Sequence, residues 1–179
     1  MKRLLAAAAL AALPAALAGP AWAGPDATTL AGVYKHLQPP STEDGITVRT
    51  EDILEIVPYG KVKDKAYFRL YMRFARYHTC DATGIAKTTR TGLEYDATVN
   101  GTACRMKISF TPKGLKIEDG SGGCTSAFCG ARGTLNWTSP ITRSDRRPIR
   151  YGERILESDE YGQAVAIEEK AVAGKPPAP

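Results

Sequence analysis

Four cysteines are the residues in this chain whose type and spacing suggest chemistry most clearly. They are Cys80, Cys104, Cys124 and Cys129. Their spacings contain no CxxC pair, and only His36 and His78 could add imidazole ligands, so we expect no metal site. An even number of cysteines in an oxidising compartment is typical of disulfides instead, and we predict two.

The other reactive residues form no pattern that predicts catalysis. A serine or cysteine nucleophile needs a positioned base, and neither histidine has such a context. Paired carboxylates could act as acid and base, but Glu94 and Asp96 face basic residues in a predicted hairpin, and Glu43-Asp44 falls in a turn-like segment. We therefore expect a protein that is not an enzyme and that uses no cofactor.

A glycine-rich segment, Gly120-Ser121-Gly122-Gly123-Cys124, leads into Cys129-Gly130-Ala131-Arg132-Gly133. No Gly-Lys-Ser/Thr sequence opens a helix here, so the segment is not a phosphate loop. In one interpretation its glycines supply positive-φ turns around a disulfide, and Arg132 pairs with a strand carboxylate. In the other, the stapled loop is pre-organised for a partner protein, and Ser121, Gly122 and Arg132 are its contact residues.

The first 23 residues are typical of a secretory signal peptide. Lys2 and Arg3 precede an apolar run over 4–17, and Ala21-Trp22-Ala23 is a small-residue cleavage site. The run is too short for a membrane span, and Pro14 interrupts it. We expect a periplasmic or secreted protein. Losing Lys2 and Arg3 lowers the net charge from +5 to +3, an excess too small to predict nucleic-acid binding.

Alternation of apolar and polar residues predicts an all-β domain over residues 24–140. In its clearest strand, 65–74, Phe68 and Leu70 alternate with Tyr67 and Arg69. The other expected strands are 30–37, 47–57, 80–89, 93–99, 104–110, 115–118 and 131–137. About eight strands at roughly ten-residue spacing favour a small antiparallel meander, closed or nearly closed into a barrel.

One hairpin can be predicted in register. Asn100-Gly101 is a preferred pair for a type I′ turn. The cross-strand pairs that follow are Ala97–Cys104, Tyr95–Met106, Leu93–Ile108, Asp96–Arg105 and Glu94–Lys107. Apolar residues then face one another on one side and opposite charges on the other, which a shift by one residue would destroy.

The disulfide pairing stays open between two arrangements. The hairpin after Phe110 carries Cys104 toward Cys124, whereas the hairpin around Thr91-Gly92 carries Cys80 opposite Thr102 or Ala103, beside Cys104. We favour Cys80–Cys104 with Cys124–Cys129, which closes a short loop. The alternative is Cys104–Cys124 with Cys80–Cys129.

The composition changes after Trp137. We predict a C-terminal helical segment over 141–170, packed on the barrel, and a disordered tail over 171–179. Arginines dominate the start of this segment and acidic residues its later part: Arg143, Arg146, Arg147, Arg150 and Arg154, against Glu153, Glu157, Asp159 and Glu160. A helix dipole favours the reverse order. The arginines therefore have a partner of their own or pair with strand carboxylates such as Glu51, Asp52 and Glu55.

Five segments resemble motifs of a family of secreted proteobacterial proteins to which no chemistry is assigned. They are Gly32-Val33-Tyr34, Asp52-Ile53-Leu54-Glu55-Ile56-Val57-Pro58, Ala66-Tyr67-Phe68-Arg69-Leu70, Cys129-Gly130-Ala131-Arg132-Gly133 and Arg146-Arg147-Pro148-Ile149-Arg150-Tyr151. More distantly, the chain is similar to periplasmic C-type lysozyme inhibitors. In those families a Ser-Gly loop and a basic residue block the lysozyme cleft, and Ser121-Gly122 is the nearest match here.

Two functions remain as hypotheses. The first is an envelope protein that binds a partner, with a lysozyme-type enzyme as the candidate, through Ser121, Gly122 and Arg132. The alternative is a carrier that holds a small ligand in the barrel mouth among Tyr67, Tyr71 and Tyr95. A filled barrel favours the first, and a deep apolar cavity favours the second.

Overall fold

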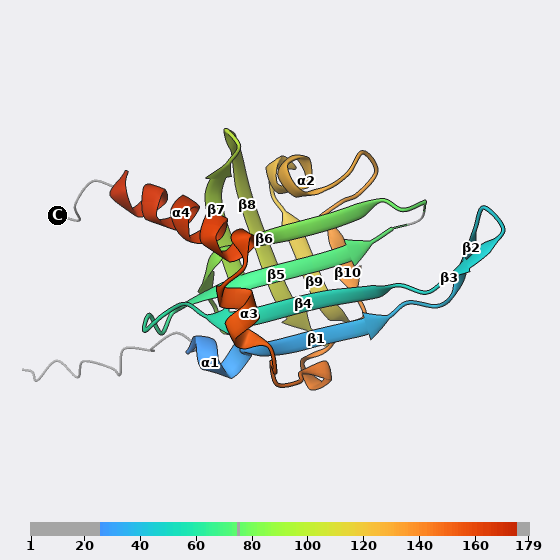
Figure 1. Cartoon of the computed structure of the whole chain (residues 1–179), viewed down its shortest axis with the longest axis horizontal. Coiled ribbons are helices and arrows are strands. Elements are labelled where there is room, and N and C mark those ends of the chain that lie inside the picture. Colours follow the sequence, from blue (N-terminus) through green and yellow to red (C-terminus); the bar gives the residue numbers. More distant parts are fainter. Residues whose placement is uncertain (1–25, 75, 175–179) are drawn as a thin grey trace, which may run out of the picture.

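A computed structural model describes residues 26–74 and 76–174 (Figure 1). Eight antiparallel strands form one sheet, in the order β1-β4-β5-β6-β7-β8-β9-β10, that curls into a nearly closed barrel. The strands are β1 (Gly32–Leu37), β4 (Glu51–Pro58), β5 (Lys65–Arg73), β6 (Thr79–Thr88), β7 (Gly92–Val99), β8 (Thr102–Thr111), β9 (Gly114–Asp119) and β10 (Trp137–Ser139). The prediction of an all-β, barrel-like fold is confirmed.

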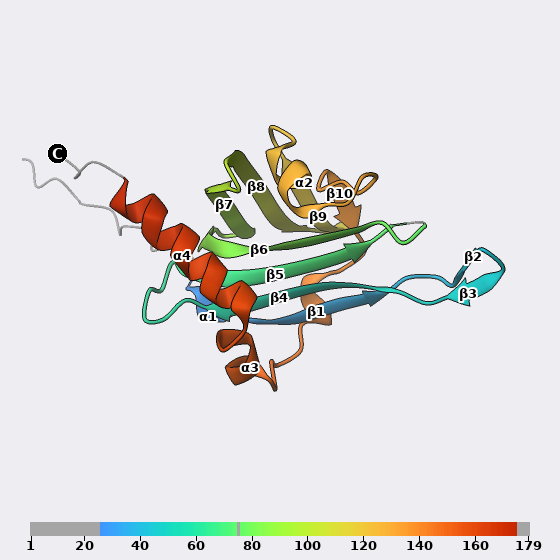
Figure 2. The ribbon, with the colours of Figure 1, turned by 45° about the horizontal axis from the view of Figure 1, so that its top comes forward.

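A small second sheet projects from one end of the barrel. It pairs β2 (Ser41–Glu43) with β3 (Ile46–Val48) in the connection between β1 and β4. In both ribbon views this hairpin extends at the end opposite the C-terminal helix (Figures 1 and 2). The two ends of the barrel therefore carry different structures.

The predicted hairpin forms as β7 and β8, with every predicted pair in register. Asn100 and Gly101 have φ values of 49° and 81°, the left-handed region that a type I′ turn requires. Lys107 Nζ lies 3.2 Å from Glu94 Oε1, on the exposed face. Local turn chemistry and cross-strand pairing thus agree at this site.

Side chains fill the interior of the barrel. Phe68 and Leu70 face inward from β5 and are fully buried. The Tyr95 ring meets Phe68 edge-on, with centroids 5.3 Å apart. On its other side Tyr95 lies so close to Gly84 that a Cβ at that position would overlap the ring. An aromatic side chain therefore occupies the space that Gly84 leaves in β6.

The seam between the edge strands β1 and β10 is covered by the segment that follows β10. Val33 and Arg147 exchange two backbone hydrogen bonds, 2.9 and 2.8 Å long. Arg146 Nε donates to the carbonyl of Ala31 at 2.7 Å. The backbone of this arginine-rich segment thus pairs with the free edge of β1, which blunts an exposed strand edge.

The prediction that these arginines pair with strand carboxylates is wrong. Glu51 pairs with Lys35, and Glu55 pairs with Arg69. Asp52 accepts hydrogen bonds from neutral side chains. Because the carboxylates are used within the sheet, the arginines bind backbone carbonyls and the rings of Phe110 and Tyr151 instead.

Two helices follow the arginine-rich segment and cover the outer face of β4, β5 and β6: α3 (Gly152–Leu156) and α4 (Asp159–Ala173) (Figure 2). Ile155 and Ala164 pack there with Val57, Tyr67 and Ile85. The unusual charge order has a simple cause, because the arginines up to residue 150 precede both helices. Within α4 itself, Asp159 and Glu160 occupy the first turn and Lys170 the last, as the dipole favours.

The predicted disordered tail is wrong at its start, because α4 continues through residues 171–173. Residues 175–179 and the predicted signal peptide lie outside the described residues. Two short helices complete the fold, α1 (Ala27–Leu30) before β1 and α2 (Gly123–Phe128) after β9, together with a 3₁₀ turn over Arg143–Asp145.

Candidate functional site at the barrel mouth

The two predicted disulfides form, but the favoured pairing is wrong. The bonds are Cys80–Cys129 and Cys104–Cys124. The error lies in the pairing of β6 with β7, which stops after Lys87–Glu94 and Thr88–Leu93. Because β6 then leaves β7, Cys80 never reaches the level of Cys104. It pairs across an isolated bridge with Cys129 instead.

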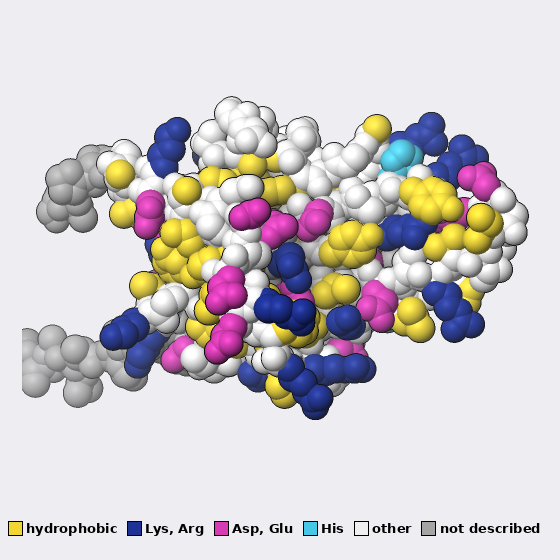
Figure 3. Space-filling model, viewed as in Figure 1, with side chains coloured by type: hydrophobic (Ala, Val, Ile, Leu, Met, Phe, Trp, Pro, Cys, Tyr) yellow, Lys and Arg dark blue, Asp and Glu magenta, His cyan; other side chains and the backbone are white. Residues whose placement is uncertain are grey.

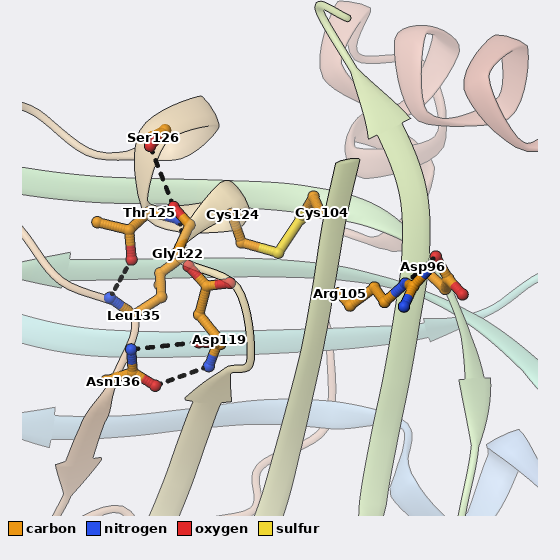
Figure 4. The surroundings of a disulfide bond; sticks show 10 residues. All are labelled: Asp96, Cys104, Arg105, Asp119, Gly122, Cys124, Thr125, Ser126, Leu135 and Asn136. Carbon is orange, nitrogen blue, oxygen red and sulfur yellow. Dashed lines mark hydrogen bonds and ion pairs between the residues drawn. A yellow bond between two sulfur atoms is a disulfide. The ribbon is translucent and has the colours of Figure 1, made fainter. Parts of the chain in front are cut away.

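The segment from Cys124 to Cys129, two cysteines that are bonded to different strands, is mostly a helix, α2, and not the open loop that the glycines before it suggest. Gly122 precedes α2 with a φ of 73° and has no side chain to cap the helix. Asp119, at the end of β9, supplies the cap, because its Oδ2 accepts from the backbone N–H of Thr125 at 2.7 Å. A carboxylate at a helix N-terminus stabilises the helix. Figure 4 shows this arrangement beside the Cys104–Cys124 bond.

A second set of hydrogen bonds holds the chain that follows α2. Leu135 N–H donates to Thr125 Oγ1 at 3.0 Å, and the Asn136 side chain bonds both the N–H and the carbonyl of Asp119 (Figure 4). We call residues 119–137 the stapled segment. Two disulfides and these hydrogen bonds fix it on the barrel.

The predicted contact residues lie at the two ends of α2. Ser121 is exposed and precedes the helix, whereas Arg132 is exposed and follows it. The helix alone rises about 9 Å over its six residues, so one small ligand would not contact both. Arg132 forms no ion pair within 4 Å in the described part of the chain. The predicted pairing of Arg132 with a strand carboxylate is therefore wrong.

The strand expected over 131–137 is also wrong, because pairing begins only at Trp137. Gly130 N–H donates to the carbonyl of Thr79 at 3.0 Å, next to the Cys80–Cys129 bond. From there the chain crosses to β10. The stapled segment thus runs along the end of the barrel where β5 ends and β6 begins. Trp137, its last residue, lies at the same end.

This end of the barrel is a mouth lined by inward-facing residues. Along β4 the inward positions are apolar at Ile56 and Leu54, and then polar at Asp52. Tyr34 and His36 show the same change along β1, since they pair with Leu54 and Asp52. A cavity of about 300 Å³ lies here. Its lining residues are His36, Gln38, Pro39, Asp52, Arg73, Phe74, Trp137 and Pro140.

The polar floor of the mouth is built around Asp52, which has only 2% of its surface exposed. Its Oδ1 accepts from Gln38 Nε2 at 2.6 Å and its Oδ2 from Ser139 Oγ at 2.9 Å. Gln38 Nε2 also donates to the carbonyl of Arg73 at 3.1 Å. Side chains from β4 and β10 and from the chain after β1 are therefore held in one network.

Arg73 leaves one buried donor free in this network. One terminal nitrogen lies 3.0 Å from Glu43 Oε2, and the guanidinium stacks over the Tyr77 ring at 4.5 Å. The Nε is buried and has no acceptor among the described residues. Buried polar groups are almost always hydrogen-bonded, so this N–H is suited to an acceptor that enters from outside.

The walls of the mouth are apolar. The Phe74 and Trp137 rings meet edge-on with centroids 5.5 Å apart, and Trp137 is 44% exposed. Pro39 and Pro140 complete the walls. In Figure 3, apolar and basic side chains gather at the end that carries the β2–β3 hairpin. Apolar walls with a few placed polar groups are typical of binding sites.

The mouth lacks the arrangement that nucleophilic catalysis requires. Ser139 Oγ donates to Asp52 rather than to His36, and Ser139 is fully buried. A nucleophilic serine would instead donate to the base. No group of three or more His, Cys, Asp or Glu side chains in the described ranges could hold a metal ion.

The three tyrosines predicted for ligand binding do not share one site. Tyr95 lies in the barrel core, whereas Tyr67 faces the opposite side of the sheet and packs under α3 and α4. Tyr71 lines a separate cavity on that outer side. Alternation along β5 places Tyr67 and Tyr71 on the outer face of the sheet. Tyr95, on β7, projects into the barrel instead.

Buried tyrosines give a testable pH dependence. Burial raises the pKa of Tyr67 and Tyr95 to about 12, whereas an unfolded tyrosine titrates near about 10. Between these values the unfolded chain releases protons that the folded chain retains. The stability that the two tyrosines contribute is therefore fully present below pH 10 and is lost as the pH rises toward 12. Tyrosinate absorbance of the folded protein should show a component near pH 12 that is absent in urea. A single step near pH 10, with no loss of stability, would contradict this assignment.

Comparison with profiles of known protein families, with curated protein sequences and with solved structures finds no match. None of the helices in the described ranges is both long and apolar enough to cross a membrane. The site is therefore defined by its own geometry.

Sequence reasoning missed most of the mouth. The sequence pattern places Phe74, Trp137 and Asp52 in separate expected strands and indicates no common site for them. The available signal was the change from apolar to polar at the inward positions of 32–37 and 51–58. That signal becomes visible only once the two strands are known to pair.

Proposed function

We propose that this chain is an extracytoplasmic, non-enzymatic binding protein whose partner protein docks over the barrel mouth and the adjoining stapled segment. Trp137 carries the proposal. A tryptophan with 44% of its surface exposed, fixed edge-on against Phe74 above a polar floor, has the form of an interface anchor.

Rigidity supports a partner-binding role for this end of the barrel. Two disulfides and the Asp119 cap hold the stapled segment before any partner arrives. A surface that is already ordered loses less conformational entropy on association. The rim adds exposed apolar area at Leu37 and Tyr77, which adjoin the lining residues Gln38 and Arg73.

The filled barrel favours a partner protein over a carried ligand. Core side chains occupy the interior of the barrel. The volume of the mouth, about 300 Å³, is at the small end of the range for ligand sites, so a small ligand with an acceptor for Arg73 Nε is the second candidate. The first partner to test is a lysozyme-type enzyme, because the resemblance to lysozyme inhibitors implies one and the exposed Arg132 could enter its cleft.

The experiment is affinity capture by the mature protein from periplasmic extract and from lysozyme-containing fluid, together with a lysozyme activity assay. We expect one protein to be retained at stoichiometric yield. Unchanged lysozyme activity in excess protein removes the inhibitor hypothesis and leaves other partners. Retention of a small molecule by the mouth, with no protein retained, would favour the second candidate instead.

Two substitutions in the stapled segment test its part in the interface. Arg132→Ala and Ser121→Ala should weaken partner binding severalfold, because both residues are exposed on an ordered surface. Their melting temperatures should hardly change, since exposed substitutions usually shift stability by no more than about 0.5 kcal/mol. Binding is measured by surface plasmon resonance and stability by thermal unfolding. Normal binding by both variants would exclude the stapled segment from the interface.

A further inference from the structure

A ridge of arginines follows β10 and runs beside β1. Its members are Arg143, Arg146, Arg147 and Arg150, and all four are exposed. We call these four residues the arginine ridge. Figure 3 shows basic side chains gathered along the lower edge of the molecule, below the place of β1 in Figure 1. None of the four lines the mouth, so the arginine ridge is distinct from the proposed partner site.

The charge of the arginine ridge is not balanced within the protein. Asp145 is the only carboxylate between residues 138 and 152, and it accepts hydrogen bonds from the backbone N–H and the hydroxyl of Thr142. No arginine of the ridge forms an ion pair within 4 Å over residues 26–74 and 76–174. Four guanidinium groups thus share one carboxylate, and the ridge carries an excess of positive charge.

Two of the guanidinium groups are held in place by neutral groups. Arg146 Nε donates to the carbonyl of Ala31 at 2.7 Å. A terminal nitrogen of Arg143 donates to the carbonyl of Arg90 at 3.0 Å, and the guanidinium lies 5.6 Å from the centroid of the Phe110 ring. Carbonyl oxygens and a ring position these groups without neutralising their charge. Because a guanidinium has five N–H donors, both arginines keep donors for a further acceptor.

The other two arginines use only their backbone in the fold. The backbone of Arg147 pairs with that of Val33, but the side chains of Arg147 and Arg150 make no hydrogen bond or ion pair among the residues that the structure describes. Like charges close together repel one another and oppose the compact state. Since strand carboxylates do not pair with these arginines, the other sequence-based alternative remains, which is a partner outside the chain.

We propose that the arginine ridge binds the phosphate groups of an anionic phospholipid surface. A guanidinium binds phosphate oxygens through two parallel N–H···O bonds, a geometry that the ammonium group of lysine does not offer. All four basic residues of the ridge are arginines. Their excess positive charge is complementary to a surface of phosphodiester groups.

The shape of the ridge favours an extended surface over a small anion. The ridge projects from the edge of the molecule and lines neither of the two cavities described above (Figure 3). A projecting group cannot enclose a free phosphate, whereas a membrane presents many headgroups to it at once. The large hydrophobic residues exposed in the described ranges include none between positions 140 and 155. Adsorption is therefore electrostatic, without insertion into the bilayer.

The test is co-sedimentation of the mature protein with vesicles of phosphatidylcholine alone and with vesicles that contain an equal amount of phosphatidylglycerol. We expect binding to the anionic vesicles and none to the neutral ones. Raising the salt concentration from about 0.01 M to about 1 M should abolish binding, because the screening length falls from about 30 Å to about 3 Å. Absence of binding to the anionic vesicles at low salt, or binding that survives high salt, overturns the proposal.

Soluble phosphates at matched ionic strength separate a membrane from other sources of the same chemistry. Inorganic phosphate should not displace the protein from the anionic vesicles, and a soluble polyphosphate should bind more weakly than vesicles of equal phosphate content. Displacement by inorganic phosphate would identify a site for the free ion. Tighter binding of polyphosphate would identify a soluble polyanion, and either result contradicts binding to a lipid surface.

Matched variants test the ridge itself. A basic residue near an anionic surface typically contributes about fivefold in affinity, so Arg147→Gln combined with Arg150→Gln should weaken vesicle binding about 25-fold. The melting temperature should hardly change, since neither guanidinium is bonded in the fold.

The control combines Arg105→Gln with Lys107→Gln. It removes the same charge from β8, where both residues are paired with carboxylates, and should change vesicle binding by less than about twofold. Equal losses in the two double variants would show that binding depends on net charge and not on the arginine ridge, which contradicts the proposal.

Discussion

Replacing Cys80 and Cys129 together by alanine is expected to lower the free energy of unfolding by about 4 kcal/mol. The bond joins residues 49 positions apart, and a cross-link over a longer loop removes more entropy from the unfolded chain. The Cys104–Cys124 bond joins residues only 20 positions apart. Replacing both of these cysteines by alanine should lower the free energy of unfolding by about 3 kcal/mol. Folded domains have only about 5–15 kcal/mol of stability, so each loss would be large.

Urea unfolding followed by circular dichroism measures both losses, and peptide mapping without reductant identifies the bonds in the wild-type protein. The Cys80/Cys129 variant should also lose partner affinity, because that bond anchors the stapled segment ahead of Trp137. A loss below about 1 kcal/mol, or recovery of a Cys80–Cys104 peptide, would contradict the observed connectivity.

The sequence predicts the fold best where neighbouring residues determine the structure. The β7–β8 hairpin depends on Asn100-Gly101 and on pairs within ten residues of that turn, and its register is correct throughout. Alternation in β5 is equally local, and it separates Phe68 from Tyr67 as predicted. In both elements one short stretch contains the turn chemistry and the polarity pattern needed.

Prediction fails where distant segments decide the outcome. Nothing near Cys80 indicates that β6 leaves β7 after two pairs. The helical state of 123–128 depends on Asp119 as a cap and on packing against the core, because Gly122 and Gly123 at its start favour a loop. The disulfide pairing and the formation of α2 are therefore determined by tertiary contacts.

The mouth combines these difficulties. Asp52 on β4, Phe74 just after β5 and Trp137 on β10 meet only when the sheet curls and its edges approach. Single residues such as Arg132 could be predicted as exposed, since they lie among glycines. Their spatial relation to an aromatic wall could not, because it depends on the Cys80–Cys129 bond.

Trp137→Ala is expected to weaken partner binding about thirtyfold or more, equivalent to about 2 kcal/mol. The indole forms one wall of the mouth and is the largest exposed side chain on it. Aromatic anchors of this kind dominate binding energies, whereas exposed aliphatic residues elsewhere contribute little. Leu156→Ala is the matched control, because Leu156 is also 44% exposed but lies on α3, away from the mouth.

The most direct test of the barrel mouth as the binding site is the affinity of these two variants for the captured partner, measured by surface plasmon resonance beside the wild-type protein. The expected result is a loss of about thirtyfold for Trp137→Ala and a change within about twofold for Leu156→Ala. Wild-type affinity in Trp137→Ala, or equal losses in both variants, would show that the partner does not bind at the mouth.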